Sequence, residues 1–153
     1  MIKAALARWE GCAAACRADR AAGFDISGFA DLLRPSVTVA IGDPGMSVCS
    51  AEVEVFRFDF GMASHPDSGR KALNLQADSD GIVDGVVQWI RLELDPETSL
   101  EARPEPGATF FSSPRFWPFP RAVRMGRGQT VGIVAEYDNG CLALRSNPSE
   151  LSD

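Results

Sequence analysis

The chain has 153 residues, of which 45% are hydrophobic, and its formal net charge at neutral pH is −6. This composition is typical of one globular domain and excludes a disordered chain. The acidic balance argues against nucleic acid as a partner, and the lack of any run of about 18 apolar residues argues against a membrane partner or span. The N-terminus lacks the apolar segment of a signal peptide, so we expect a cytoplasmic protein with reduced thiols.

Residues 2–22 carry two conflicting signals. Apolar side chains recur every three to four residues and alanine is abundant, which favours a helix that ends at Gly23. The stretch 2–10 is also compatible with a strand. A further short helix is expected within 25–33, because Pro35 prevents its continuation.

The next part of the chain changes to the two-residue period of β-strands. Strands are expected at 37–41, at 53–60 and at 72–77. The apolar phase changes within the second of these, which predicts a bulge near Val55. The polar, glycine-containing segment 61–70 predicts a loop.

We expect residues 81–95 to form the central strand of the sheet. Its first half, 82–87, is apolar in both phases, as in a strand covered on both faces. Its second half, 88–95, alternates between apolar and charged residues, which indicates one face in contact with solvent. Gly85 marks a bulge where the phase changes, and Trp89 is expected to be buried.

Residues 97–120 form a less regular region that is rich in proline and aromatic residues. Its aromatic side chains are Phe110, Phe111, Phe116, Trp117 and Phe119. Such a segment either packs as a plug against one end of the core or lines a groove that binds a ligand. The sequence leaves both alternatives open.

The last third of the chain contains two hairpin signals. Strands are expected at 121–125 and 130–136, joined by a hairpin turn, and at 141–145 after the turn signal Asn139-Gly140. We therefore predict a mainly β protein, a single antiparallel β-barrel or sandwich with one or two short helices in its N-terminal third. The domain is expected to span residues 1–145, and residues 146–153 to form a flexible tail.

We find no set of catalytic or metal-binding residues in the sequence. His65 is the only histidine and falls in an expected loop, so neither a Ser-His-Asp nor a Cys-His arrangement is indicated. Cys12, Cys16, Cys49 and Cys141 lack the paired spacings of a zinc site. No strand is followed by the glycine-rich turn and helix that bind a nucleotide. The prediction is no catalytic residue, no metal and no cofactor in this chain.

Four stretches have an informative order and spacing. They are Gly23-Phe24-Asp25-Ile26-Ser27, Val53–Phe60, Val86–Glu93 and Arg115-Phe116-Trp117. Together they resemble successive parts of the C-terminal β-barrel domain of the protein arginine methyltransferase family, with bacterial relatives more similar than eukaryotic ones. These parts are the arm region, the strand after it, a strand with an aromatic residue before its acidic end, and the Thr-His-Trp loop. The resemblance covers about residues 1–145.

The resemblance implies particular functional residues. Pocket candidates for the substrate are Arg115, Phe116 and Trp117. Of these only Trp117 matches the family's loop, in which the first two residues are Thr and His. Arm candidates are Phe24, Asp25, Ile26 and Phe29. The resemblance also favours a strand at 2–10, where the family enters its barrel.

The resemblance implies a non-catalytic barrel that helps to bind substrate. S-adenosylmethionine is expected only for a catalytic domain that precedes the barrel in the family and has no counterpart in this sequence. The chain would then be a fragment, a split-gene product or a remnant. Implied partners are an S-adenosylmethionine-binding domain or chain and a second copy, which would dimerise through the arm at 11–35. The alternative is a free-standing binding module that uses the aromatic loop 110–119.

Overall fold

The computed structural model describes residues 1–12, 20–21, 23–25, 36–106 and 112–146. Every element bounded within these residues is a β-strand, and all their strand pairs are antiparallel. The strands are β1 (Ile2–Trp9), β2 (Arg20–Ala21), β3 (Phe24–Asp25), β4 (Val37–Thr38), β5 (Met46–Val48), β6 (Val53–Phe56), β7 (Ser68–Gln76), β8 (Gly81–Glu93), β9 (Ser99–Glu101), β10 (Arg115–Met125), β11 (Thr130–Asp138) and β12 (Cys141–Ser146).

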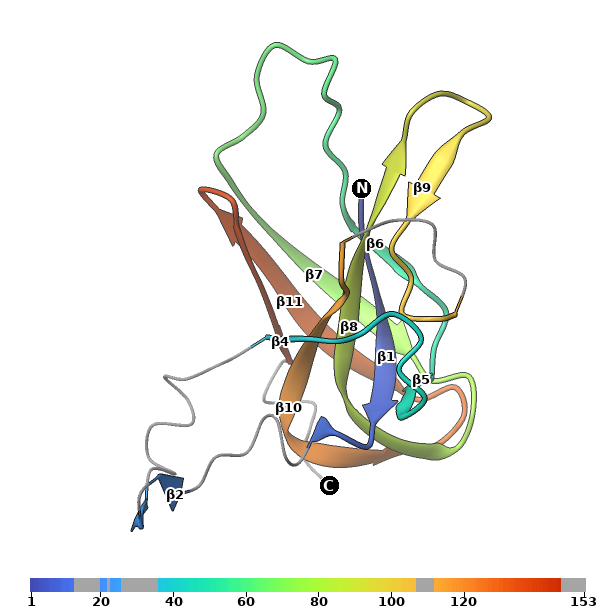
Figure 1. Cartoon of the computed structure of the whole chain (residues 1–153), viewed down its shortest axis with the longest axis vertical. Helices are drawn as coiled ribbons and strands as arrows, with labels where there is room; N and C mark the ends of the chain where they lie inside the picture. Colours follow the sequence, from blue (N-terminus) through green and yellow to red (C-terminus); the bar gives the residue numbers. More distant parts are fainter. Residues whose placement is uncertain (13–19, 22, 26–35, 107–111, 147–153) are drawn as a thin grey trace.

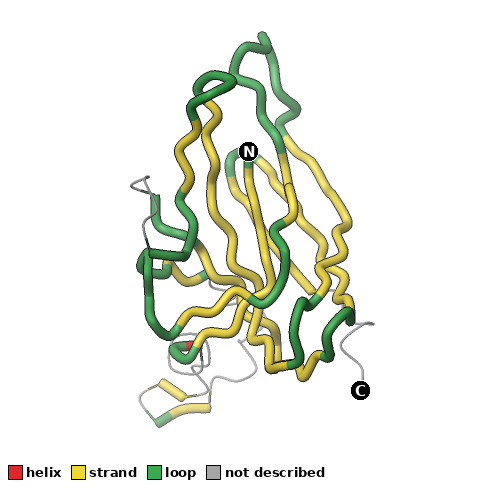
Figure 2. The backbone as a smooth tube through the Cα atoms, turned by 90° about the vertical axis from the view of Figure 1, so that its right-hand side faces the viewer, coloured by secondary structure: helices red, strands yellow, loops and turns green. Residues whose placement is uncertain are grey.

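The strands form a large curled sheet, a smaller sheet and a separate two-stranded pair. The large sheet has seven strands in the order β4-β10-β8-β1-β5, with β6 also paired to β1 and β9 to β8. The smaller sheet has the order β12-β11-β7, and β2 pairs with β3. Figures 1 and 2 show the two main sheets curling toward each other as a half-barrel. The predicted antiparallel β fold is confirmed.

The central strand is β8, as the sequence predicts. It has 13 residues and lies between β10 and β1 in the large sheet, and its residues 85–89 are all buried, so its middle is covered on both faces. Trp89 is buried. The predicted irregularity at Gly85 is also present: Gly85 pairs with Pro118, but the next paired residue, Val83, faces Val123. The extra residues of this bulge lie on β10.

Two apolar cores lie on opposite faces of the large sheet, and β1 contributes to both. Ala4 and Leu6 join the core shared with the smaller sheet, whereas Ala5 and Ala7 join a second core around Trp89. A strand buried on both faces gains packing along its whole length. This outweighs the helix preference of its alanines, which is worth only a few tenths of a kcal/mol per residue. The strand expected at 2–10 is therefore confirmed.

The bulge predicted near Val55 is confirmed by the pairing of β6 with β1. Ile2 pairs with Phe56, but Lys3 pairs with Glu54, so Val55 is the extra residue. The side chain of Val55 is fully buried in the core between the two sheets. The bulge thus turns one more apolar side chain inward than regular alternation permits.

Two expectations for the second half of the chain differ from the structure. Strands 121–125 and 130–136 do not form a hairpin, because β10 belongs to the large sheet and β11 to the smaller one. The turn 126–129 is instead a corner between sheets, closed by a hydrogen bond from Gln129 N to Gly126 O of 3.0 Å. The region 97–120 is more regular than expected, because β9 and the start of β10 lie in it. Pro118 and Pro120 are tolerated because the pairing with β8 is interrupted after Pro118.

The short helices expected in the N-terminal third are not borne out. Much of this region, including residues 13–19 and 26–35, lies outside the described residues. Where it is described, Arg20–Ala21 and Phe24–Asp25 form a strand pair. Antiparallel pairing across Gly23, whose φ is +87°, replaces the helix end that we expected at this glycine. The tail 147–153 also lies outside the described residues.

Candidate functional site

The three pocket candidates begin β10, and Phe116 points to the opposite face of the strand from Arg115 and Trp117. Arg115 is exposed, and its Nη1 donates a hydrogen bond of 3.1 Å to Ser36 Oγ. Phe116 is fully buried in the second core, where its ring meets Trp9 edge-to-face at a centroid distance of 5.3 Å. Trp117 is half-buried against the core shared by the two sheets. Because β10 is a strand, neighbouring side chains alternate between its faces and do not converge on one cavity.

Trp117 differs from the other two tryptophans in its indole N–H. Trp9 Nε1 donates to Asp43 at 3.1 Å, and Trp89 Nε1 donates to Glu101 at 2.7 Å. Trp117 Nε1 is shielded from solvent and has no acceptor among the described residues. A buried donor without an acceptor costs about 1–3 kcal/mol. Of the three pocket candidates, Trp117 is therefore the one with a buried polar group whose hydrogen bond is not made within the described residues.

Gly85 positions this start of β10. A Cβ atom at Gly85 would lie 2.8 Å from Phe116 Cζ and 2.9 Å from Pro118 Cα. Both distances are shorter than real Cβ contacts, so the close approach of β10 to β8 requires glycine at this position. The backbone of Trp117 consequently passes directly over the central strand.

The arm candidates are only partly described. Phe24 and Asp25 form β3, and the side chain of Phe24 is exposed. Ile26 and Phe29 lie outside the described residues. The assignment of this segment to a dimer arm stays a prediction.

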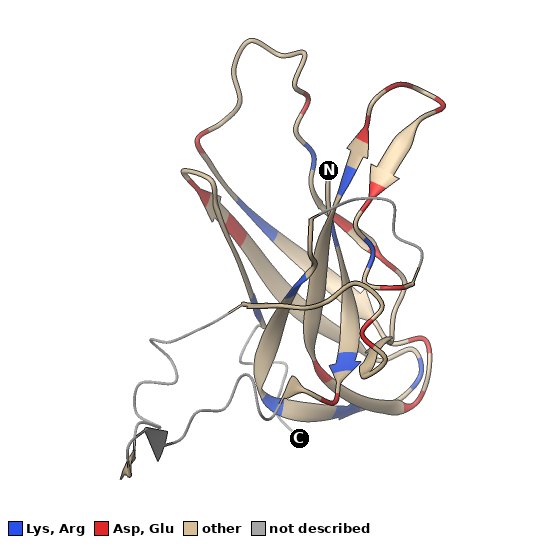
Figure 3. Ribbon diagram, viewed as in Figure 1, with Lys and Arg blue, Asp and Glu red and all other residues tan. Residues whose placement is uncertain are grey.

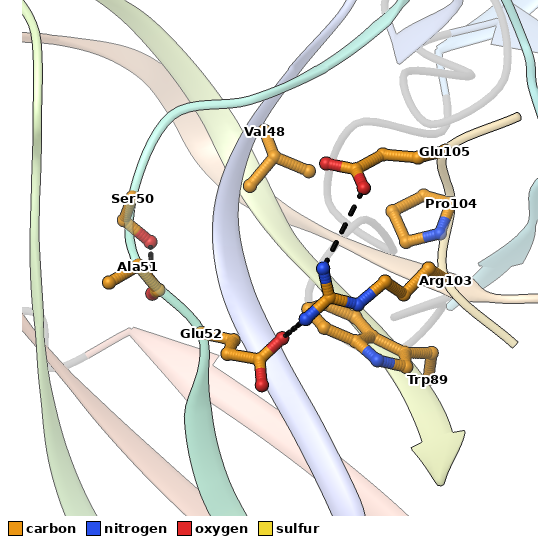
Figure 4. A pocket seen from close by; sticks show the side chains of 8 residues that line it. All are labelled: Val48, Ser50, Ala51, Glu52, Trp89, Arg103, Pro104 and Glu105. Atoms are coloured by element: carbon orange, nitrogen blue, oxygen red, sulfur yellow. Dashed lines mark hydrogen bonds and ion pairs between the residues drawn. The ribbon is translucent and has the colours of Figure 1, made fainter. Parts of the chain in front are cut away.

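A pocket that the sequence analysis did not identify lies beside Trp89 (Figure 4). It has a volume of about 300 Å³. Its lining residues are Val48, Ser50, Ala51, Glu52, Trp89, Arg103, Pro104 and Glu105. They come from three places in the chain: the end of β5 with its connection to β6, the middle of β8 and the segment after β9. Only the fold brings these segments together.

An ion-pair network surrounds Arg103 in this pocket. Arg103 Nη2 donates to Glu52 Oε2, and Arg103 Nε lies 3.2 Å from Glu101 Oε1. Arg103 Nη1 is 3.8 Å from Glu105 Oε2. Lys3 Nζ contacts the other oxygen of Glu52 at 3.3 Å. Three carboxylates thus share two cations, and Figure 4 shows Arg103 between Glu52 and Glu105.

The network favours the ionised forms of Glu101 and Arg103. Burial by itself opposes ionisation of Glu101, but hydrogen bonds from Trp89 and Arg103 outweigh it and lower the pKa of Glu101. For Arg103, burial favours the neutral form, but the bond to Glu101 and the nearby carboxylates raise its pKa. Neither group exchanges a proton near neutral pH. The pocket is suited to binding or to structural support.

The described cysteines and acidic residues form no metal site. Among the described residues, no group of three or more His, Cys, Asp or Glu side chains has the geometry to hold a metal ion. Cys12 is buried, Cys49 is half-buried and Cys141 is exposed. Burial raises the pKa of Cys49, so its thiol stays protonated at neutral pH. Across the described ranges, no helix is long and apolar enough to span a membrane.

Comparison with known proteins finds a structure of similar fold but no protein of similar sequence. No protein-family model matches the chain, and no curated protein matches it. Among solved structures, the chain is similar to a chain of the Trypanosoma brucei PRMT1 enzyme-prozyme heterotetrameric complex with AdoHcy, with a TM-score of 0.67 and 10% identity. The similarity covers 95% of this chain and 52% of that chain.

At this level of identity the similarity shows the fold alone. The class that it defines is an antiparallel β-barrel fold like the one in a PRMT1 chain. The present chain spans about half the length of that relative. Activity, substrate and partners of the whole relative are therefore matters for a proposal.

Proposed function

We propose that this chain is the non-catalytic barrel of a protein arginine methyltransferase-like assembly, with an accessory role in substrate binding. The observation that carries the proposal is the structural similarity over 95% of the chain to a PRMT1 chain. Three of the four resembling sequence stretches supply strands of the large sheet, namely β6, β8 and the start of β10. The methyl-donor site would be supplied by another domain or chain that binds S-adenosylmethionine.

In this proposal Arg115 and Trp117 face the substrate. Arg115 is exposed, and Trp117 has a buried N–H without an acceptor in the described part of the chain. Phe116 supports them from the second core. An aromatic ring beside a peptide also suits an arginine side chain, because guanidinium groups stack on tryptophan.

The alternative of a free-standing module with an aromatic binding loop has less support. Phe116 and Phe119 are buried in the two cores and cannot contact a ligand without rearrangement. Phe110 and Phe111 lie outside the described residues. Within 112–119, the aromatic side chains mainly build the core.

Calorimetric titration of the isolated chain with S-adenosylmethionine tests the proposal that another domain or chain binds the methyl donor. We expect no binding with a dissociation constant below about 100 μM, which corresponds to roughly −5.5 kcal/mol. Tighter binding by the chain alone would contradict the proposal.

The assembly recovered from source cells through a tag on this chain tests the substrate role. We expect it to transfer labelled methyl groups from S-adenosylmethionine to arginine peptides. Trp117→Ala should raise KM for the peptide at least several-fold, whereas Arg127→Ala, in the exposed corner 126–129, should leave it unchanged. Equal KM values in both variants would show that Trp117 does not bind the substrate.

A further inference from the structure

Two polar residues are buried within the described part of the chain, Ser50 and Gln88. Ser50 is 4% exposed, and hydrogen bonds account for its position, because its Oγ accepts from Leu6 N at 2.8 Å and donates to Ala51 O at 2.9 Å. Gln88 is 7% exposed, yet its side-chain carboxamide has no hydrogen bond to another described residue. Nearly all buried polar groups in proteins have a partner, so this carboxamide requires an explanation.

Gln88 faces the core that the two main sheets share. Along β8, Val86 belongs to this shared core and Val87 belongs to the second core. Because side chains alternate along a strand, Gln88 lies on the same face as Val86. Its paired residue on β1 is Ala4, which is part of the shared core, and its paired residue on β10 is Arg115. Gln88 and Arg115 are therefore neighbours on one face of the large sheet.

The rows of paired side chains on this face show that Gln88 lies where the shared core ends. Leu6 pairs with Val86 in the row on one side of Gln88, and both are buried. Ile2 pairs with Ile90 in the row on the other side, and both are half-buried. Burial thus decreases across the three rows, and the row of Gln88 is the boundary.

The carboxamide of Gln88 is reachable from solvent. The indole Nε1 of Trp117, on the same face of β10, is fully enclosed and has no acceptor among the described residues. The nitrogen and oxygen atoms of the Gln88 carboxamide are not enclosed in this way. A bound molecule can therefore reach both atoms from the half-buried side of the core boundary.

The surroundings of Gln88 favour an uncharged binding group. Residues 85–90 of β8 carry no charge, and the middle of this strand is tan in Figure 3. A carboxamide offers both a donor and an acceptor. The N–H and C=O of one residue in an extended peptide point to the same side, so a glutamine side chain satisfies both at once. The chemistry of this position thus matches a peptide main chain.

We propose that Gln88 binds the main chain of the substrate peptide, with Nε2 donating to a peptide carbonyl and Oε1 accepting from a peptide N–H. This inference rests on the proposed function and adds a third residue to the substrate-facing pair Arg115 and Trp117. Arg115 is the direct cross-strand neighbour of Gln88, with Cβ atoms about 5 Å apart, and Trp117 is the diagonal neighbour at about 7 Å. Gln88 holds the peptide without reading its side chains.

The stability of the isolated chain tests whether Gln88 has a structural role instead. Gln88→Leu keeps a side chain of similar size and removes a polar group that has no partner in the described chain, so its melting temperature should be unchanged or higher. Gln76→Leu is the matched control and should melt lower, because Gln76 Nε2 donates to Gly128 O at 2.9 Å. A lower melting temperature for Gln88→Leu would overturn the inference.

Peptide binding to the assembly recovered through a tag on this chain tests the contact itself. The probe is a fluorescently labelled arginine peptide, and its dissociation constant is measured by anisotropy. Gln88→Leu should raise this constant at least about fivefold, because the hydrogen bonds to the peptide group are lost. Gln76→Leu should leave it unchanged. An unchanged constant for Gln88→Leu would show that Gln88 does not contact the peptide.

Peptides in which an ester oxygen replaces one main-chain N–H locate the contact along the peptide. At one position the ester should weaken binding to the unmodified assembly, but it should cause no further loss in Gln88→Leu, where the bond is already absent. Losses of the same size in both proteins at every position would contradict a hydrogen bond to Gln88.

Methyl transfer by the same assembly separates this inference from the proposed function. Methyl transfer with equal dissociation constants for the unmodified protein and Gln88→Leu would overturn the inference and leave the proposed function standing. Peptide binding that depends on Gln88, without methyl transfer, would contradict the proposed function alone. If the assembly neither binds nor methylates the peptide, both fail.

Discussion

Two aromatic segments of this protein are similar in composition but end in opposite environments. Segment 53–60 and segment 115–119 each carry three aromatic residues within eight positions or fewer. Phe116, in the second segment, is fully buried, whereas Phe60, at the end of the first, is 81% exposed. The difference shows that aromatic content alone does not predict which segment forms the core.

The environments differ because the two segments have different numbers of neighbours. β10 begins inside the large sheet between β8 and β4, and the cores on the two faces of this sheet bury Phe119 and Phe116. The chain after β6 leaves the sheet, and within the described residues the ring contacts of Phe58 and Phe60 are with Phe56, Tyr137 and His65. The packing on the face of the sheet decides how much apolar surface is removed from water, and hence how much each aromatic ring stabilises the fold.

The largest expected effect on stability is the difference between truncating the buried Phe116 and truncating the exposed Phe60. Phe116→Ala should reduce the free energy of unfolding by ~3–5 kcal/mol, because it removes a fully buried ring and leaves a cavity. Phe60→Ala should change it by less than about 0.5 kcal/mol, because the side chain is mostly in solvent already. Urea denaturation of both variants measures the difference. If Phe116→Ala does not fold, Phe116→Leu should still lose more stability than Phe60→Ala.

Trp117 lies between these extremes and sharpens the comparison. Trp117→Ala should cost ~2–4 kcal/mol, less than a fully buried aromatic residue, because the side chain is half-buried. Trp117→Phe should cost about 1 kcal/mol or less, since it also removes the indole N–H that has no described acceptor. Denaturant midpoints at constant slope give both values. A loss below about 1 kcal/mol for Trp117→Ala would contradict a role of Trp117 in the core.

Gly85 tests whether close packing of β10 on β8 causes the burial of segment 115–119. Gly85→Ala should destabilise by ~1–3 kcal/mol, because the added methyl group would overlap Phe116 and the backbone of β10. Gly81→Ala, at the start of the same strand, has open space around the added Cβ and should change stability by less than about 0.5 kcal/mol. Equal melting temperatures for the two variants would show that β10 can move away at little cost.

The smallest expected effect concerns the polar border of the second core. The pKa of Glu101 is lowered in the folded protein, so its ionised form stabilises the fold at every pH above its ordinary value of 4.5. This contribution should disappear as the pH falls below 4.5 through the lower folded pKa. Glu101→Gln should therefore flatten the loss of stability between about pH 5 and pH 3, as measured by thermal melts. Glu97→Gln, in the exposed β8–β9 turn, serves as the control and should keep the slope of the wild-type protein.

Local features of the fold were determined by the sequence itself. The hairpin at Asn139-Gly140 follows from two residues that tolerate positive φ, and the observed angles are 45° and 82°. The central strand 81–93 and the bulge at Val55 follow from the spacing of apolar residues. Such features depend on neighbours in the chain, which the sequence displays directly.

The tertiary structure alone decided which distant segments meet. The pairing of β10 with β8 in place of β11, the contact of Glu52 with Arg103 across 51 positions, and the exposure of Phe60 have no local signal. The sequence resemblance suggested that Arg115, Phe116 and Trp117 belong to one loop. It did not reveal that they lie in a strand, where Phe116 points to the opposite face from the other two. Each of these outcomes is set by packing between elements far apart in sequence, where the largest gain in buried surface overrides local preference.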